Sequence, residues 1–143
     1  MTGDRTGTRA GRRRSRDLLV RALYQWQIAD STERELLEQF ETDADYGKSD
    51  RKHFGEVLGF VLENAAALDA VIARHASRSL DQLDAVGRAV LLLALAELTH
   101  CHDVPPKVVI NEAVELTKRY GATDSYKFVN ALLDKAASEI RTS

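Results

Sequence analysis

Five arginines lie close together near the start of the chain: Arg9, Arg12, Arg13, Arg14 and Arg16. Planar guanidinium groups match the geometry of phosphate oxygens and also stack on nucleobases. On a helix, spacings of three and four place Arg9, Arg12, Arg13 and Arg16 along one side. This pattern predicts a polyanion-binding surface, with a solvated helix end or a nonspecific basic tail as the alternative interpretation.

The distribution of charge favours a nucleic-acid site over that alternative. The net charge is −2, yet residues 1–21 contain seven Arg and two Asp and therefore carry +5. The remaining 122 residues must carry −7. A basic segment on an otherwise acidic chain indicates a localised site for a polyanion. Because binding to phosphates releases counterions, its affinity should fall steeply with salt.

A second group of candidate binding residues lies between residues 120 and 128. Tyr120 and Phe128 could stack on bases, while Asp124 and Ser125 could hydrogen-bond to base edges, as in the recognition of single-stranded RNA. The alternative is structural, with Asp124 or Thr123 capping a helix and both rings in the core. Gly121 follows the last periodic residue of the preceding segment, which predicts a left-handed C-cap.

Tyr24 is a candidate for a protein interface. It lies one turn after Arg21 and off the apolar stripe of Leu19, Leu23 and Trp26. An exposed tyrosine on a helix is typical of protein–protein interfaces. The alternative is a tyrosine at the edge of the core.

No catalytic, cofactor or metal site is predicted. His100, Cys101, His102 and Asp103 are adjacent, so their side chains would point in different directions on a helix, and no second Cys/His pair completes a tetrahedral site. The chain lacks a P-loop, a dinucleotide-binding glycine motif and a convincing carboxylate pair. We therefore do not expect an enzyme. The single cysteine excludes an intramolecular disulfide and favours a reducing compartment.

The elements that must position these residues are helices, because apolar residues recur at spacings of three and four and no segment alternates as a strand does. Residues 86–101 are apolar nearly all round, which indicates a buried central helix. We predict an all-α protein of six to seven helices with bundle-type packing. The expected helices span residues 9–29, 33–41, 50–64, about 65–75, 86–101, 108–120 and 125–140.

We divide the chain into a disordered tail (residues 1–8), an N-terminal helical half with the Arg-rich first helix (9–76) and a C-terminal helical half (77–143). The two halves are expected to form one compact domain. The longest apolar run, residues 89–96, is too short to span a bilayer, which needs about 20 residues. The N-terminus lacks the apolar segment of a secretory signal. We therefore expect a cytoplasmic protein.

The segment NEAVELTKRYGATDSYKFVN, residues 111–130, resembles the C-terminal signature of the NusB family of bacterial transcription antitermination factors. The Arg-rich start and the segment ALYQWQ, residues 22–27, also resemble this family. The likeness implies two three-helix bundles that share a core. It also implies binding of boxA-type RNA from ribosomal RNA leaders together with the ribosomal protein NusE, within the antitermination complex on RNA polymerase.

The resemblance also assigns roles to individual residues. The positions that match the family's RNA-contacting pattern are Arg12, Arg13, Arg14, Arg16, Tyr120, Asp124, Ser125 and Phe128. Tyr24 and Asp81 match positions that meet the NusE partner. The chain departs from the family at four positions: Gly87 replaces a frequent acidic residue, Leu92 a frequent arginine, Ala96 a frequent tyrosine and Ala131 a frequent glycine.

Two other classes of function fit the residues. One is a helical protein–protein adaptor, which could be a homodimer, with the basic tail incidental. The other is an RNA-binding accessory module of an RNA methyltransferase, since such enzymes carry a NusB-like domain. This chain contains no recognisable cofactor-binding domain of its own.

Overall fold

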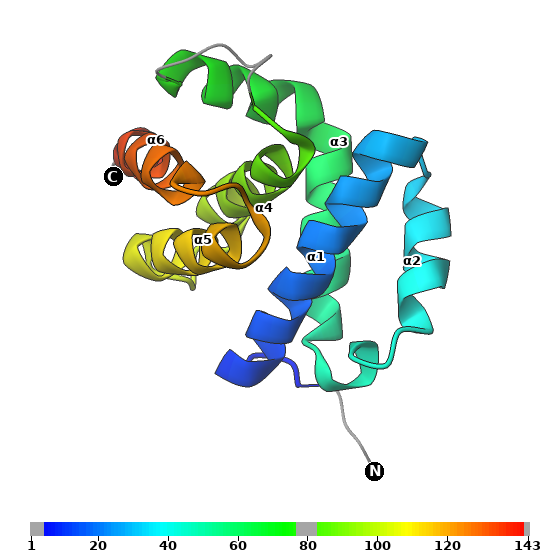
Figure 1. Cartoon of the computed structure of the whole chain (residues 1–143). Coiled ribbons are helices and arrows are strands. Elements are labelled where there is room, and N and C mark those ends of the chain that lie inside the picture. The colour runs from blue at the N-terminus through cyan, green and yellow to red at the C-terminus, as the bar shows by residue number, and fades with distance from the viewer. Residues whose placement is uncertain (1–4, 77–82, 142–143) are drawn as a thin grey trace.

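The computed structural model describes residues 5–76 and 83–141. Within these residues the chain forms six α-helices, one short 3₁₀ helix and no strand (Figure 1). The helices are α1 (Arg9–Ala29), α2 (Glu33–Glu41), α3 (Arg51–His75), α4 (Ala85–His100), α5 (Pro106–Tyr120) and α6 (Ser125–Ile140), with η1 (Tyr46–Lys48) between α2 and α3. The all-α prediction is confirmed.

Helix α4 is the centre of the structure. Residues 89–98 are all buried, as the apolar sequence predicted, and Leu91, Leu92, Leu95 and Leu98 have no exposed surface. Helices α1, α3, α5 and α6 all pack against α4. In Figure 1, α1, α2 and the first part of α3 lie on one side of α4, and α5 and α6 lie on the other.

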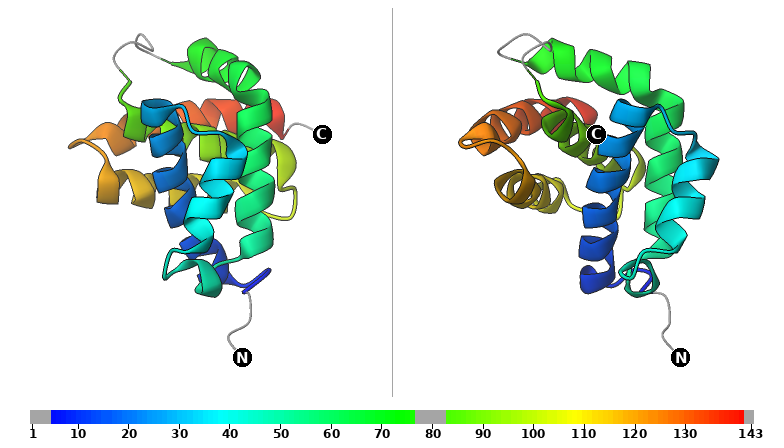
Figure 2. Two further views of the ribbon diagram at one scale, coloured as in Figure 1. Left: turned by 90° about the vertical axis from the view of Figure 1, so that its right-hand side faces the viewer. Right: turned by 45° about the vertical axis from the view of Figure 1, so that its right-hand side comes forward.

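Helix α3 bends at Asn64, whose φ of −117° and ψ of 19° are not helical. The two parts point in different directions in all three views, and the second part arches over α6 (Figures 1 and 2). The sequence contains no Gly or Pro at this point that would end the helix. The two helices predicted for residues 50–75 therefore form one helix with a kink at the predicted junction. The bend lets a single helix contact both α1 and α6.

Local sequence explains where the helices begin. The Oγ1 of Thr8 accepts a hydrogen bond from the N–H of Gly11 and caps α1. Thr32 and Glu35 form a reciprocal capping box at α2.

We expected residues 1–8 to be disordered, but the described part of this segment, residues 5–8, is held in place. The N–H of Arg5 donates to the carbonyl of Ser49, and the N–H of Gly7 donates to Asp50. The small, polar character of residues 1–8 did not reveal these contacts, because both acceptors lie more than 40 residues away in the sequence.

Candidate nucleic-acid interface

Helix α1 presents three of the predicted arginines, Arg9, Arg13 and Arg14, to solvent. The side chain of Arg13 is 62% exposed, and that of Arg14 is 46% exposed. Arg13 lies 3.3 Å from Glu112 of α5, and Arg14 lies 3.0 Å from Asp45 before η1. The Arg14–Asp45 pair is exposed on both sides, and such pairs contribute little to stability, so a phosphate can replace Asp45 at small cost.

Arg12 is held closer to the protein. Its Nε lies 3.2 Å from Asp50, and its Nη1 lies 3.0 Å from Asp103. Burial by itself would lower the pKa of Arg12, but the hydrogen bonds and charges of the two aspartates raise it above the ordinary value. Burial alone would likewise raise the pKa of Asp50, but hydrogen bonds from the N–H groups of Gly7 and His53 and from Arg12 keep it below its usual range. Arg12 therefore contributes to holding the fold together, and only part of its side chain is available to a ligand.

Arg16, which we predicted to contact RNA, is buried. Its Nε and Nη2 donate to the two carboxylate oxygens of Glu97 in α4, at 2.7 and 2.9 Å. Arg12 and Arg16, one helical turn apart on α1, face the rest of the protein, whereas Arg13 faces solvent. Burial opposes ionisation of Glu97, but the neighbouring His53 ring and the two hydrogen bonds from Arg16 hold the pKa of this carboxyl at about 2. Arg16 thus fixes α1 to α4 and is not part of the surface.

Tyr120 links the end of α5 to the middle of α1. Its hydroxyl donates to Oδ1 of Asp17 at 2.5 Å, and Nη1 of Arg119 donates to the same oxygen at 2.9 Å. Burial and the contact with Asp17 raise the pKa of the tyrosine above its usual value. Because Arg13 precedes Asp17 by one helical turn, it lies on the same face of α1. Arg13 and Arg119 line one shallow hollow of about 130 Å³.

The turn between α5 and α6 differs from the prediction. Gly121 was expected to adopt the left-handed conformation, yet its φ is −91° and its backbone is extended. A Cβ at this position would lie 2.8 Å from the carbonyl oxygen of Thr117, so the glycine is needed for a close approach. Asp124 instead has the positive φ, 68°. Aspartate tolerates this region better than most residues.

Asp124 occupies the N-cap position of α6 but makes no capping hydrogen bond through its side chain. Its exposed carboxylate lies 3.7 Å from Nζ of Lys127. Asp124, Ser125 and Phe128 line a pocket of about 280 Å³ together with Gly87. Phe128 is half-buried and packs against the core. The Phe128 ring therefore fits both interpretations. It packs against the core, as the structural interpretation requires, and it also lines the pocket, as the binding interpretation requires.

Tyr24 lies on a larger surface groove. The groove has a volume of about 820 Å³ and runs between α1 and α2, with Val86 of α4 and Tyr120 at its edge. Tyr24 is 43% exposed, and Ile28, one turn later, is also exposed. Exposed apolar residues that gather in one groove are typical of a protein contact. Asp81, the other predicted partner residue, lies outside the described residues.

Sequence reasoning missed several residues of these surfaces. Glu112, Asp45 and Asp17 pair with the exposed basic side chains, and Ile28 and Phe40 line the groove. The excess of acidic residues outside the basic segment was a signal for Glu112 and Asp45, whereas Asp17 lies within that segment. Ile28, which falls outside the Leu19–Leu23–Trp26 stripe, was a signal for the groove.

The structure is thus an all-helical protein with an arginine-bearing first helix beside an aromatic corner. Comparison with known proteins identifies the class. The NusB family model matches residues 13–138. The chain belongs to the NusB family, as the resemblance indicated.

Individual relatives agree with this assignment. The chain is 48% identical to the "Transcription antitermination protein NusB" of Yersinia pestis (strain Pestoides F) over 132 residues, which cover 92% of this chain and 96% of that protein. It is 45% identical to the protein of the same name from Psychromonas ingrahamii, covering 92% and 91% of the two chains. A solved structure of T. maritima NusB superposes with a TM-score of 0.74 at 36% identity and covers 89% of this chain and 90% of that one.

Among the described residues, none of the helices is both long enough and apolar enough to cross a membrane.

Proposed function

We propose that this chain is an RNA-binding transcription antitermination factor. In this proposal it binds boxA-type RNA of ribosomal RNA leaders together with a NusE-type ribosomal protein, and the complex supports processive transcription by RNA polymerase. The role is binding rather than catalysis, and it is exercised in the cytoplasm. The names of the relatives support the antitermination role, and the arrangement of the surface residues supports the finer assignment.

The observation that carries the RNA assignment is the contact between helix α1 and the C-terminal end of helix α5. Asp17 of α1 holds both Arg119 and Tyr120 of α5, and Arg13 lines the same hollow as Arg119. Arg13 and Arg14 are proposed to contact phosphates, and Arg12 contributes its exposed edge. Specific recognition of a single strand needs stacking and base-edge groups as well.

The corner supplies those groups. Tyr120 and Phe128 are proposed to stack on bases, and Ser125 and Asp124 to hydrogen-bond to base edges. Arg16 is left out of the RNA surface because its guanidinium is buried against Glu97.

The groove around Tyr24 is the proposed contact for the NusE-type protein. Its residues Tyr24 and Ile28 are exposed in this chain, and Tyr120 lies at its edge as well as at the aromatic corner. The two proposed surfaces therefore adjoin, which is the geometry expected if protein partner and RNA bind together. Gly87, where the family often has an acidic residue, lies in the neighbouring pocket beside Asp124.

Fluorescence anisotropy with a labelled boxA-like RNA and a scrambled RNA, with and without the NusE-type protein, tests the proposal. We expect tighter binding of the boxA-like RNA, and further tightening with the partner. Arg13→Ala should weaken binding, whereas the matched control Arg34→Ala, an exposed arginine on α2, should not. Equal affinity for both RNAs in the presence of the partner would instead favour the protein-adaptor alternative.

A further inference from the structure

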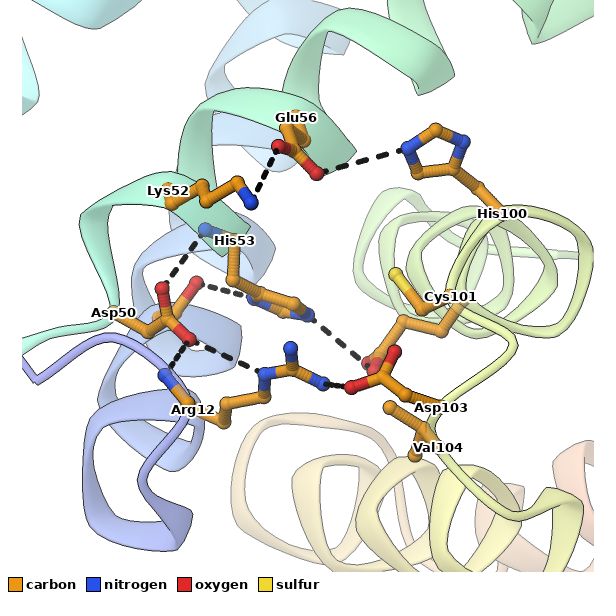
Figure 3. Close-up of polar contacts among 12 residues, drawn as sticks. Arg12, Asp50, Lys52, His53, Glu56, His100, Cys101, Asp103 and Val104 are labelled. Carbon is orange, nitrogen blue, oxygen red and sulfur yellow. Dashed lines mark hydrogen bonds and ion pairs between the residues drawn. The ribbon is translucent and has the colours of Figure 1, made fainter.

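We propose that His53, Glu97 and Cys101 form a binding site for a divalent d-block cation of the zinc type. The three side chains lie between α3 and the C-terminal end of α4, beside a polar pocket of about 240 Å³ that His53 and Cys101 help to line. Figure 3 shows His53 of α3 directed toward the end of α4, where Cys101 lies. The proposal is independent of the RNA and partner surfaces.

The first observation is the proximity of three different ligand atoms. One atom from each side chain can be chosen so that all three lie within 4.8 Å of one another, and all three residues are buried. Cys101 directly follows α4, and its N–H donates to the carbonyl of Glu97. This hydrogen bond of the last helical turn keeps the thiol on the same side as the carboxylate.

The second, independent observation is an unsatisfied nitrogen. The side chain of His53 is only 1% exposed, and its Nε2 is buried without a hydrogen-bond partner. This atom lies 3.4 Å from Oε2 of Glu97. Buried polar atoms without a partner are rare in folded proteins and call for an explanation. A cation bound between Nε2 and the carboxylate would satisfy it.

The other ring nitrogen is already oriented for this role. Nδ1 of His53 lies 2.6 Å from Oγ of Ser15 in α1, and both side chains are buried. When Nδ1–H donates to the hydroxyl, the lone pair of the neutral ring is on Nε2, which is the form that a metal binds. Metal-binding histidines ordinarily have such a hydrogen bond on their second nitrogen.

Glu97 can hold a cation without losing Arg16. An ionised carboxylate offers about four lone-pair sites. Arg16 uses one on each oxygen, at 2.7 and 2.9 Å. A further lone pair on Oε2 remains on the oxygen that lies closest to His53. Arg16 would then orient the carboxylate, as outer hydrogen bonds do for metal-binding carboxylates.

The donor set indicates which cation the site would take. Sulfur, imidazole nitrogen and one carboxylate oxygen suit zinc and cobalt, whereas magnesium and calcium prefer oxygen alone. With Zn–S of about 2.3 Å and Zn–N of about 2.0 Å, tetrahedral ligand atoms lie roughly 3.5 Å apart. The side chains must therefore move closer together by about an ångström. Water from the pocket can complete the fourth position.

Charge balance also permits a cation. Three acidic and two basic residues line the pocket: Asp50, Glu56, Asp103, Arg12 and Lys52. When the cation binds, the thiol of Cys101 releases its proton to solvent and becomes a thiolate. The added negative charge offsets the repulsion from Arg16.

Titration of the tag-free 143-residue chain with Co²⁺ tests the proposal. Cys101 is the only cysteine in the sequence, so a thiolate-to-cobalt absorption band can come from this residue alone. We expect the band to saturate at one Co²⁺ per chain and to disappear when Zn²⁺ is added. His53→Gln should weaken Co²⁺ binding at least tenfold, whereas the matched control His100→Gln, at the exposed mouth of the same pocket, should leave it unchanged.

A measurement on the unaltered chain covers the case in which His53→Gln fails to fold. The ¹⁵N resonances of the His53 ring should shift on addition of one equivalent of Zn²⁺, and those of His102, which is exposed, should not. Absence of the thiolate band at millimolar Co²⁺ would overturn the proposal. A band accompanied by unchanged His53 resonances would also overturn it, because it would indicate a metal held by the thiol alone.

Discussion

Arg16 of α1 and Glu97 of α4 form a buried ion pair with two hydrogen bonds, although the residues are 81 positions apart in the sequence. Both side chains are almost fully excluded from solvent. The pair connects the Arg-rich first helix to the apolar central helix. It therefore sets where the neighbouring arginines emerge on the surface.

Removing one partner of this pair should destabilise the fold strongly. Arg16→Gln should lower the free energy of unfolding by about 3–5 kcal/mol, because Glu97 would be left buried without its cation. Urea denaturation measures the change. Arg14→Gln is the matched control, since its pair with Asp45 is exposed and should contribute less than about 1 kcal/mol. A loss below 1 kcal/mol for Arg16→Gln would mean that the pair does not hold α1 in place.

The same pair predicts how stability depends on pH. Glu97 has an ordinary pKa of 4.5 and a folded-state pKa of about 2. A carboxyl group whose pKa is lowered by folding stabilises the fold above its unfolded pKa, and this contribution is lost as the pH falls through the folded pKa. Urea midpoints should therefore decline between about pH 4.5 and pH 2. Glu97→Gln should show a shallower decline in this range, and an identical slope would contradict the assignment.

Leu95 tests the central position of α4. Its side chain has no exposed surface. Leu95→Ala should cost about 2–5 kcal/mol in the free energy of unfolding, the range for truncating a packed leucine. Val108→Ala, at an exposed position on α5, should change it by less than about 0.5 kcal/mol. Similar losses for the two variants would show that α4 is not the core.

Tyr24 tests the proposed partner surface. Tyr24→Asp should weaken the complex with the NusE-type protein and leave the melting temperature nearly unchanged, because the ring is half-exposed. Isothermal titration calorimetry and thermal melting measure the two quantities. Val108→Asp, an exposed apolar residue outside the groove, is the matched control. A large fall in melting temperature with Tyr24→Asp would instead indicate a structural tyrosine at the edge of the core.

Substitution of Asp124 is predicted to strengthen RNA binding, whereas substitution of Arg13 or Phe128 is predicted to weaken it. The exposed carboxylate of Asp124 makes no capping bond and would repel RNA phosphates. Asp124→Asn removes the charge and keeps a side chain that tolerates positive φ, so it should strengthen RNA binding without changing stability. Asn keeps an oxygen that can accept the proposed hydrogen bond from a base edge, so weaker binding in an anisotropy titration would mean that this contact needs the charged carboxylate.

How much the sequence could predict depended on the range of the interactions. Residues 86–101 are apolar on nearly all sides, which correctly indicated a buried helix, because this signal is local. The pairing of Arg16 with Glu97 and of Arg12 with Asp50 spans 81 and 38 residues, so helical spacing alone could not reveal which arginines are covered. The resemblance assigned all four arginines to RNA binding. In the fold, Arg13 and Arg14 are exposed, Arg12 is partly buried and Arg16 is buried.

The turn before α6 shows the same limit. Glycine at residue 121 was compatible with a left-handed conformation, but also with the close approach to Thr117 that the structure contains. Sequence alone could not distinguish the two uses. Asp124, and not Gly121, has the positive φ. Its side chain makes no capping hydrogen bond, although an N-cap was the simplest interpretation of this aspartate.

The exposed arginines of α1 and the corner between α5 and α6 are proposed to form one RNA surface. The most direct test is the affinity for a boxA-like RNA, with the NusE-type protein present, as a function of salt for Arg13→Ala and Phe128→Ala. We predict that Arg13→Ala weakens binding and reduces the salt slope by about one phosphate contact. Phe128→Ala should cost roughly 1–3 kcal/mol with little change in slope. Unchanged affinity for both variants would contradict the claim.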